Sequence, residues 1–350
     1  MRSKGIVLLF ICFFAVQTYG QRTDIIVLKN GDRITCEITG MDRGVLFAKV
    51  DYIDGLLEID WRQVAKLESK RLFIVKTENG LVHEGTISTA PLDADKVVKI
   101  ELKVDPATNV ELKTAEVVTI DTSSQSFRKR FNGYLIAGMS YTKGNAYREY
   151  NLRGLIEYPR ERWGFQADIS SNLSASNGIR TTTRNELRTS VDRQLGRNNY
   201  FLRVGAGFLQ STEQGISLQK TFGVGVGYRF INSNRAKVSL IGGMGWQRTN
   251  YDLPDLSGAS QNTTAALIGT DIKFFKFKKA GLDLYAGVMP SVSEPGRIFS
   301  RLNQTIYYKI FPRLTLNISF YGSWDNRPPF GLPGSDYGTT TGLGWTFGSK

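Results

Sequence analysis

Most of the chain, from Gly133 to Phe347, alternates apolar and polar residues in short segments. About twelve such segments of about ten residues follow one another, each bounded by turn residues. Strict alternation is typical of a β-strand with two different faces, and no stretch has the spacing of an amphipathic helix. The pattern predicts an all-β region over residues 132–350, formed by about twelve antiparallel strands.

The phase within the segments predicts which face meets lipid. In one segment Tyr200 and Val204 share a face, whereas Arg203 lies on the opposite face. In the next segment Val226 is likewise opposite to Arg229. Because an arginine facing the middle of a bilayer costs on the order of 2–4 kcal/mol, we expect both arginines to face the lumen of a barrel.

A soluble β-sandwich would alternate in the same way, so a second feature is needed to separate the two folds. Aromatic residues recur on the apolar face near the segment ends: Trp163, Tyr200, Tyr228, Phe230, Trp246, Tyr308, Trp324, Trp345 and Phe347. Aromatic bands at two interfaces are typical of transmembrane barrels. We therefore predict an antiparallel transmembrane β-barrel rather than a sandwich.

The lengths of the connections predict its orientation. An even number of strands places both ends of the barrel in the periplasm, so every second connection should be extracellular and longer. Residues 250–262 and 325–336 form two such long connections. The alternate connections are short, at residues 159–162, 195–199, 232–235 and 311–313.

The first twenty residues have the features of a secretory signal peptide. Arg2 and Lys4 precede a short apolar run, and Thr18 to Gly20 offer small residues for cleavage. The alternative, a membrane anchor, would need about 20 apolar residues. We predict that residues 1–20 are removed after export.

Residues 21–122 predict a different, smaller β-rich module in the periplasm. Residues 26–34 are typical of a hairpin with an Asn-Gly turn, and residues 73–87 resemble that hairpin. Residues 111–120 resemble residues 58–67 in the same way. We predict two tandem SH3-like or Sm-like repeats, residues 21–71 and 72–122, followed by a linker at residues 123–131. Because such modules bind many things, a periplasmic or peptidoglycan component is a candidate partner of residues 21–122.

The formal charge of +13 falls to +11 when Arg2 and Lys4 are removed with the signal peptide. A basic chain can indicate nucleic-acid binding, but a secreted chain does not meet nucleic acid, and its cations are scattered over turns. Outer-membrane lipid and lipopolysaccharide are the expected neighbours.

The sequence offers little for catalysis or metal binding. His83 is the single histidine and lies in the N-terminal module, and Cys36 is the single cysteine left after signal removal. A Ser-His pair in the barrel wall is therefore excluded, and one His with one Cys makes a poor metal site. Glycines 223, 225 and 227 lie in mid-strand with no helix after them, unlike a nucleotide-binding loop. We expect no cofactor and no metal, and a barrel enzyme acting on lipid or glycan is disfavoured.

The strand phase predicts a charged lumen of mixed sign. The inward-facing residues are Arg153, Glu157, Asp168, Glu186, Arg188, Asp192, Arg203, Arg229, Asp271, Lys273, Asp283, Arg301 and Lys309. Twelve strands lie between the filled eight-stranded barrels and the open sixteen-stranded porins. Two interpretations stay open: a narrow channel for small polar or ionic solutes with the module as tether or plug, or a closed structural or envelope-anchoring barrel.

The chain resembles the uncharacterised YdiY-like family of salt-induced outer-membrane proteins. The resemblance rests on residues 28–32, on Ile59-Asp60-Trp61, and on the ending from Asp336 to Phe347. The resemblance implies an outer-membrane barrel, and it implies no particular activity because the family has none established. The last strand, with Leu343, Trp345 and Phe347 on one face, also resembles the signal read by the outer-membrane assembly machinery, although three residues follow the final aromatic one.

Overall fold

The computed structural model describes residues 24–89, 99–105, 108–122, 130–142, 147–160, 162–176, 179–196, 199–252, 259–275, 279–311 and 313–347. The predicted signal peptide, most of the predicted linker and the last three residues lie outside these ranges. No helix in the described part of the chain has the length and apolar character needed to cross a bilayer.

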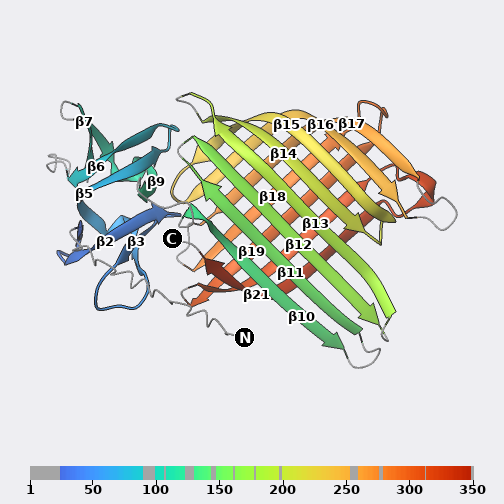
Figure 1. Ribbon diagram of the computed structural model, residues 1–350, viewed down its shortest axis with the longest axis horizontal. Coiled ribbons are helices and arrows are strands. Elements are labelled where there is room, and N and C mark those ends of the chain that lie inside the picture. Colours follow the sequence, from blue (N-terminus) through green and yellow to red (C-terminus); the bar gives the residue numbers. More distant parts are fainter. Residues whose placement is uncertain are drawn as a thin grey trace, which may run out of the picture.

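The second part of the described chain forms a closed antiparallel barrel of twelve strands (Figure 1), which confirms the predicted fold. Its strands are β10 (Asn132–Thr142), β11 (Tyr147–Pro159), β12 (Trp163–Ser176), β13 (Ile179–Gln194), β14 (Tyr200–Ser211), β15 (Ile216–Asn232), β16 (Ala236–Tyr251), β17 (Ser260–Phe274), β18 (Ala280–Pro290), β19 (Ile298–Phe311), β20 (Leu314–Asp325) and β21 (Ser335–Phe347). Each strand pairs with the next in the chain, and β21 pairs with β10 to close the ring.

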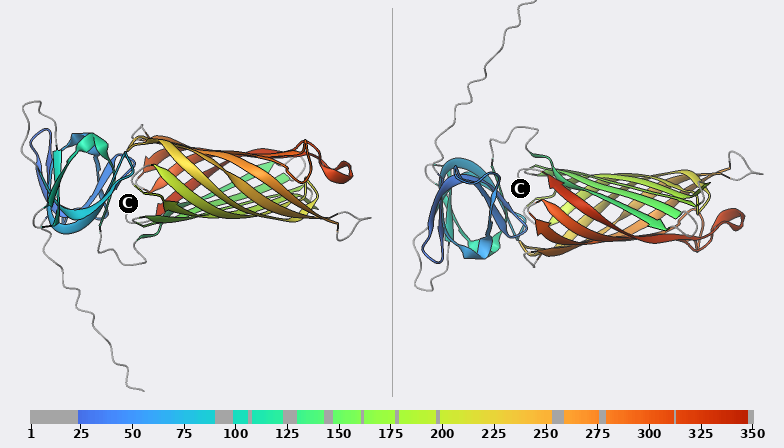
Figure 2. Two further views of the ribbon diagram at one scale, coloured as in Figure 1. Left: turned by 90° about the horizontal axis from the view of Figure 1, so that it is seen from above. Right: turned by 90° about the horizontal axis from the view of Figure 1, so that it is seen from below.

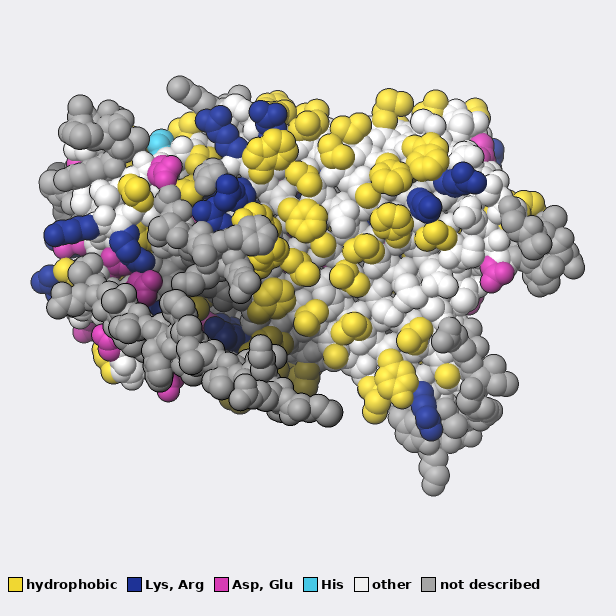
Figure 3. All heavy atoms as spheres, in the orientation of Figure 1, with side chains coloured by type: hydrophobic (Ala, Val, Ile, Leu, Met, Phe, Trp, Pro, Cys, Tyr) yellow, Lys and Arg dark blue, Asp and Glu magenta, His cyan; other side chains and the backbone are white. Residues whose placement is uncertain are grey.

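The outer face of the barrel carries the predicted apolar side chains. Val204, Val224 and Val226 are each about half exposed, and Figure 3 shows hydrophobic side chains spread over the face of the barrel that it draws. In β20, Leu316 and Ile318 are exposed while the alternate residues Thr315, Asn317 and Ser319 are buried. Since exposed apolar surface on this scale is unstable in water, the outer face is one that lipid covers.

The first part of the described chain forms one curved sheet of nine strands, which curls into a small ring (Figure 2). Its strands are β1 (Asp24–Leu28), β2 (Arg33–Asp42), β3 (Val45–Lys49), β4 (Leu57–Asp60), β5 (Val64–Thr77), β6 (Val82–Thr89), β7 (Lys99–Asp105), β8 (Thr108–Lys113) and β9 (Val117–Thr122). We call this sheet, with its two 3-10 turns η1 (Trp61–Gln63) and η2 (Thr114–Glu116), the N-terminal module.

The strand pairing of the module contains an internal repeat. β1 pairs with β2 and with the first half of β5, and the second half of β5 pairs in the same way with β6 and β9. The division predicted between residues 71 and 72 falls inside β5, a continuous strand of fourteen residues. β9 also pairs with β2, so both repeats belong to one sheet.

One hydrophobic core holds the module together. It contains Ile26 and Leu46 from the first repeat together with Leu102 and Ile120 from the second, all fully buried. Cys36 is buried in this core as a free cysteine. Burial of such side chains is the main stabilising contribution to a small β module. The two repeats therefore form a single folding unit.

The module lies against one end of the barrel, the end at which β10 begins and β21 finishes (Figures 1 and 2). The short connections predicted for the periplasmic side lie at this end, and the long ones lie at the other. We call the two openings the module mouth and the far mouth.

Candidate functional site

Ion pairs cross the lumen of the barrel. A guanidinium nitrogen of Arg203 in β14 lies 2.6 Å from a carboxylate oxygen of Asp271 in β17, although these strands are not neighbours. Arg153 in β11 donates to the hydroxyl of Thr305 in β19 at 2.6 Å. Because such contacts form only between side chains that point inward, they establish which residues line the lumen.

The half of the lumen near the module mouth keeps room for water. Arg203 holds Asp192 through two hydrogen bonds of 2.6 and 2.8 Å, and Lys273 lies 2.9 Å from Glu157 across the barrel. The side chains of these residues remain 21–28% exposed. This half of the lumen is therefore polar and only partly filled.

The half nearer the far mouth is constricted. Arg184 lies 2.5 Å from Asp336 and 3.2 Å from Glu186, and the side chains of all three are less than 10% exposed. Arg301 lies 3.4 Å from Glu186, and Arg188 lies 3.0 Å from Asp168. We call this group, with Arg153, the constriction. Its buried charges form ion pairs with one another inside the lumen.

The structure places the predicted lumen residues in these two halves. Arg153, Asp168, Glu186, Arg188 and Arg301 belong to the constriction, and Arg203, Arg229, Asp271 and Lys273 lie nearer the module mouth. The sequence reasoning missed Arg184 and Asp336. Arg184 has the phase of Glu186 and Arg188, so the alternation alone could have identified it.

Aromatic rings inside the lumen lie beneath several of these arginines. The guanidinium carbon of Arg229 lies 4.3 Å from the ring centroid of Phe201, a distance typical of a cation–π contact. A Cβ on Gly227 would lie 2.3 Å from the same ring. The glycine therefore makes room for the phenyl ring, which is the role that inward-facing glycines have in curved sheets.

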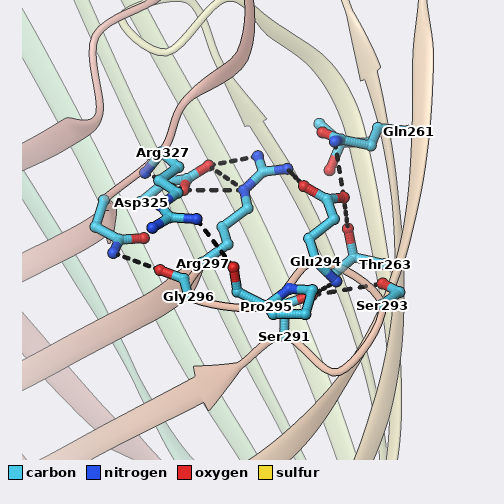
Figure 4. Close-up of polar contacts among 12 residues, drawn as sticks. Gln261, Thr263, Ser291, Ser293, Glu294, Pro295, Gly296, Arg297, Asp325 and Arg327 are labelled. Atoms are coloured by element: carbon cyan, nitrogen blue, oxygen red, sulfur yellow. Dashed lines mark hydrogen bonds and ion pairs between the residues drawn. The ribbon is translucent and has the colours of Figure 1, made fainter.

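Loops cover the far mouth. Arg297, in the connection between β18 and β19, is 2% exposed and holds both Asp325 at 2.6 Å and Glu294 at 2.9 Å (Figure 4). Glu294 also accepts a hydrogen bond of 2.8 Å from Gln261 of β17. This clamp joins β17 and β20 at the rim through the connection between β18 and β19. We call residues 291–297 the clamp loop.

The connection between β20 and β21 folds over the same mouth. It contains the short turn η4 (Pro329–Gly331), and Leu332 packs against Leu209, Ile216 and Tyr251 from the barrel wall. A cavity of about 60 Å³ remains below this loop and reaches Arg301 of the constriction. The far mouth is thus covered by an apolar contact next to an ionic clamp.

The N-terminal module covers the other mouth. The turn between β2 and β3 brings Arg43 within 3.3 Å of the hydroxyl of Tyr307 in β19. Gly44 beside it has φ +73°, and a Cβ there would lie 3.0 Å from the carbonyl oxygen of Asn234. Burial opposes the charge of Arg43, but nearby Tyr307 and Asp283 hold its pKa well above the ordinary value. Arg43 is therefore a charged side chain inserted at the barrel rim.

Further contacts between the described parts of the module and the barrel are polar. The Asn199 amide donates to the carbonyl of Glu78 at 2.8 Å, and Asn234 donates to that of Val117 at 3.2 Å. Lys309 forms an ion pair with Glu58 of the module. Polar contacts of this kind are typical of interfaces between domains that move relative to one another.

A cavity of about 250 Å³ lies between the module and the module mouth, and we call it the vestibule. Its lining combines Asp121 of the module with turn residues Arg160 and Arg162 and with lumen residues Asp192 and Arg229. The vestibule therefore joins the edge of the module to the polar half of the lumen.

The described residues offer no group of three or more His, Cys, Asp or Glu side chains that could hold a metal ion. His83 pairs with Val75 in the module, away from the lumen charges, and burial lowers its pKa. The arrangement in the lumen is one of paired charges around a narrow polar space. Such an arrangement can bind, exclude or pass ions.

Comparison with solved structures finds barrels of low sequence identity. The NanC porin is 12% identical, with 62% of this chain and 98% of that chain covered and a TM-score of 0.36. The translocator domain of the autotransporter NalP from Neisseria meningitidis is 12% identical over 61% of this chain and 87% of that chain, with a TM-score of 0.35. The outer membrane channel DcaP of Acinetobacter baumannii is 8% identical over 80% and 99%, with a TM-score of 0.28.

None of the curated proteins compared is similar to this chain. A family match, by contrast, covers nearly the whole barrel. Residues 135–347, more than half of the chain, match the family described as protein of unknown function, DUF481. The matched region begins in β10 and ends with β21, so it coincides with the closed barrel and excludes the module. The chain therefore belongs to the DUF481 family.

Proposed function

We propose that the protein is an outer-membrane barrel that passes small polar or ionic solutes through its lumen, with the N-terminal module as a plug at the periplasmic mouth. The vestibule carries this proposal, because it leads from the edge of the module to Asp192 and Arg229 inside the barrel. The partly exposed charges beyond it offer a polar path as far as the constriction. The conformation described here is then the closed one.

A closed structural barrel is the second candidate, and the constriction favours it. Arg184, Glu186 and Asp336 pair across the lumen, and both mouths are covered. A barrel that only anchors the module in the envelope would keep this arrangement permanently. The two candidates differ in whether the module and the loops ever leave the mouths.

Conductance in planar bilayers separates the two. In the full-length chain, Glu58→Cys and Lys309→Cys place thiols at the ion pair between module and barrel, where a short bis-maleimide reagent can join them. Cys36 is fully buried and should not react. We expect the channel to open before cross-linking and to open rarely after it. A barrel that is silent in every form would contradict the channel and leave the structural role.

Ion selectivity then tests the path. Arg203→Glu places a third carboxylate beside Asp192 and Asp271, so reversal potentials in a salt gradient should shift toward cation preference. Arg193→Glu makes the same charge change on the outer face, beside Trp163, and should have no effect. Equal selectivity of the two variants would mean that ions do not pass Arg203.

The orientation belongs to the same proposal: module in the periplasm and far mouth outside the cell. Asn326 is exposed in the connection after β20, so a cysteine there should react with a membrane-impermeant maleimide on intact cells. Three further points stay predictions. The assembly machinery should contact Leu343, Trp345 and Phe347. The module should have a peptidoglycan or other periplasmic partner, and the chain should be related to YdiY-like proteins. The proposal assigns no catalysis, and turnover of a lipid or glycan by the purified protein would contradict it.

A further inference from the structure

Two cations lie directly opposite each other on the outer face of the barrel. Lys220 of β15 is the cross-strand partner of Arg248 of β16. Lys220 points to the same side of the sheet as Phe222, two positions later, and Arg248 points to the same side as Trp246, two positions earlier. Phe222 and Trp246 are exposed on the outer face. The two cations therefore point away from the lumen, in the half of the barrel near the far mouth.

This pairing is unfavourable by itself, because like charges opposite each other on neighbouring strands destabilise a sheet. Within the described residues neither cation has a carboxylate partner at ion-pair distance, and β14, β15 and β16 contain no acidic residue at all. The acidic residues next along the chain, Glu213 and Asp252, lie in the connections beyond the strand ends. The protein supplies no counter-charge for this pair in the described part.

The position of the two cations matches the depth of lipid headgroups. The rings of Phe222 and Trp246, one pair closer to the middle of the barrel, are stacked with centroids 5.9 Å apart. Tryptophan and its aromatic neighbours mark the boundary of the hydrocarbon layer, and long cationic side chains beyond it extend toward the phosphates. On the face drawn in Figure 3, basic side chains likewise lie toward both ends of the barrel with hydrophobic ones between them.

We propose that Lys220 and Arg248 together bind a phosphate group of lipid A, the phosphorylated glycolipid of the outer leaflet. An arginine can hold two phosphate oxygens and a lysine supplies a second charge, so one phosphate satisfies both side chains and removes their repulsion. Asn262, the cross-strand neighbour of Arg248, offers an amide beside the same position. The inference uses the orientation proposed above, but it does not require the barrel to conduct.

The test measures lipid binding and stability in the full-length protein purified in detergent. The variant is Lys220→Gln with Arg248→Gln, and the matched control is Arg193→Gln with Arg235→Gln, which removes two exposed cations at the module end. Without lipid, the variant should unfold at the same urea concentration as the wild type or a higher one. With lipid A, the order should reverse, because only the wild type and the control gain stability.

Two comparisons make the result decisive. Lipid A stripped of its phosphates should stabilise none of the proteins selectively, and phosphatidylglycerol should stabilise wild type and variant alike. If the variant gains as much from lipid A as the wild type does, the proposed site is wrong. If phosphatidylglycerol reproduces the selective gain, the pair attracts any anionic lipid and the assignment to lipid A is wrong. Retained gel mobility shifts on heating will show that each variant is folded.

Discussion

At the scale of single residues, Arg184 is a buried cation of the constriction with four side-chain contacts. It pairs with Glu186 and Asp336, donates to Ser323 and lies over the ring of Tyr321. Removing one member of a buried ion pair leaves its partners uncompensated, at a cost of about 3–5 kcal/mol. We expect Arg184→Met to lower the free energy of unfolding by about 3 kcal/mol, measured by urea titration in lipid vesicles.

The control for this prediction neutralises the partner that depends on Arg184. Arg184→Met combined with Asp336→Asn should recover much of the loss, because Glu186 keeps its ion pairs with Arg188 and Arg301 and no buried carboxylate is left without a cation. Arg193→Met, on the exposed outer face, should change stability by less than about 0.5 kcal/mol. A double variant as unstable as the single one would show that packing, not charge pairing, explains the loss.

His83 predicts a pH dependence of the module. Burial lowers its pKa below the ordinary value, and its Nε2 atom is buried without a hydrogen-bond partner. The unfolded module therefore binds a proton more readily than the folded one. The contribution to stability is full above about pH 6.5 and is lost as the pH falls from there toward the lowered pKa. Mild urea titration followed through Trp61 fluorescence, the single tryptophan of residues 21–122, should detect this loss.

The matched variant is His83→Gln, whose stability should change less over the same pH range. Glu78 acts in the opposite direction, because burial and the neighbouring Glu116 raise its pKa, so protonation on acidification favours the folded state. The comparison is best made in a Glu78→Gln background. Identical pH profiles with and without His83 would refute its role.

The lumen residues could be predicted from the sequence because a strand repeats every two positions. Once Val204 and Val226 are assigned to lipid, Arg203 and Arg229 have only the lumen left. The same rule applies to Arg184. Arg43 could not be found in this way, because its place at the barrel rim depends on how two separately folded parts meet. No local pattern around residue 43 carries that information.

At the scale of elements, the clamp loop is the part of the far mouth that one substitution should release. Arg297 ties it to β20 through Asp325 and is 2% exposed. Arg297→Ala should free residues 291–297 and leave Asp325 without its cation. If the lumen conducts, we expect more frequent openings in planar bilayers than in the wild type.

Arg148→Ala is the control for the clamp, since it removes a cation from the same end of the barrel but from its outer face. Its opening frequency should equal that of the wild type. Equal frequencies in Arg297→Ala and wild type would mean that the clamp loop does not limit passage. The apolar contact of Leu332 would then be the next element to change.

The strands of the barrel were predictable one by one, and the loops over its mouths were not. Alternation and turn residues define a strand such as β20 locally, through exposed Leu316 and Ile318 and buried Asn317. The clamp loop folds inward because Arg297 meets a carboxylate 28 residues away in the chain. Likewise, the repeat in the module was visible in the sequence, but β5 joins the two copies through a strand that no turn residue interrupts.

At the scale of the whole molecule, the docking of module and barrel includes a testable ion pair. Lys309→Glu places two carboxylates together at Glu58, so the module should leave the mouth more often and become more sensitive to protease in intact outer membranes. Glu58→Lys alone should do the same. The double exchange restores opposite charges and should restore protection. A double variant as sensitive as either single one would show that this pair does not hold the module.

How the module docks onto the barrel could not be predicted from the sequence. The linker and the signal peptide predicted only that a periplasmic module precedes the barrel, with tether and plug equally open. Asn199 and Asn234 make their rim contacts from short turns whose sequences are similar to one another. Nothing in those sequences indicates which turn meets the module. These two contacts are made by side chains donating to backbone carbonyls, and such contacts depend on shape rather than on residue pattern.

The seam between β10 and β21 has a consequence for how the protein is made. Only five residue pairs join these two strands, whereas eleven join β10 to β11, and the strands of the seam come from opposite ends of the barrel sequence. The ring therefore cannot close until the thirteen residues of β21 are present. A chain cut before β21 should give an open sheet with two unpaired edges, a form prone to pair with other chains, instead of a smaller closed barrel.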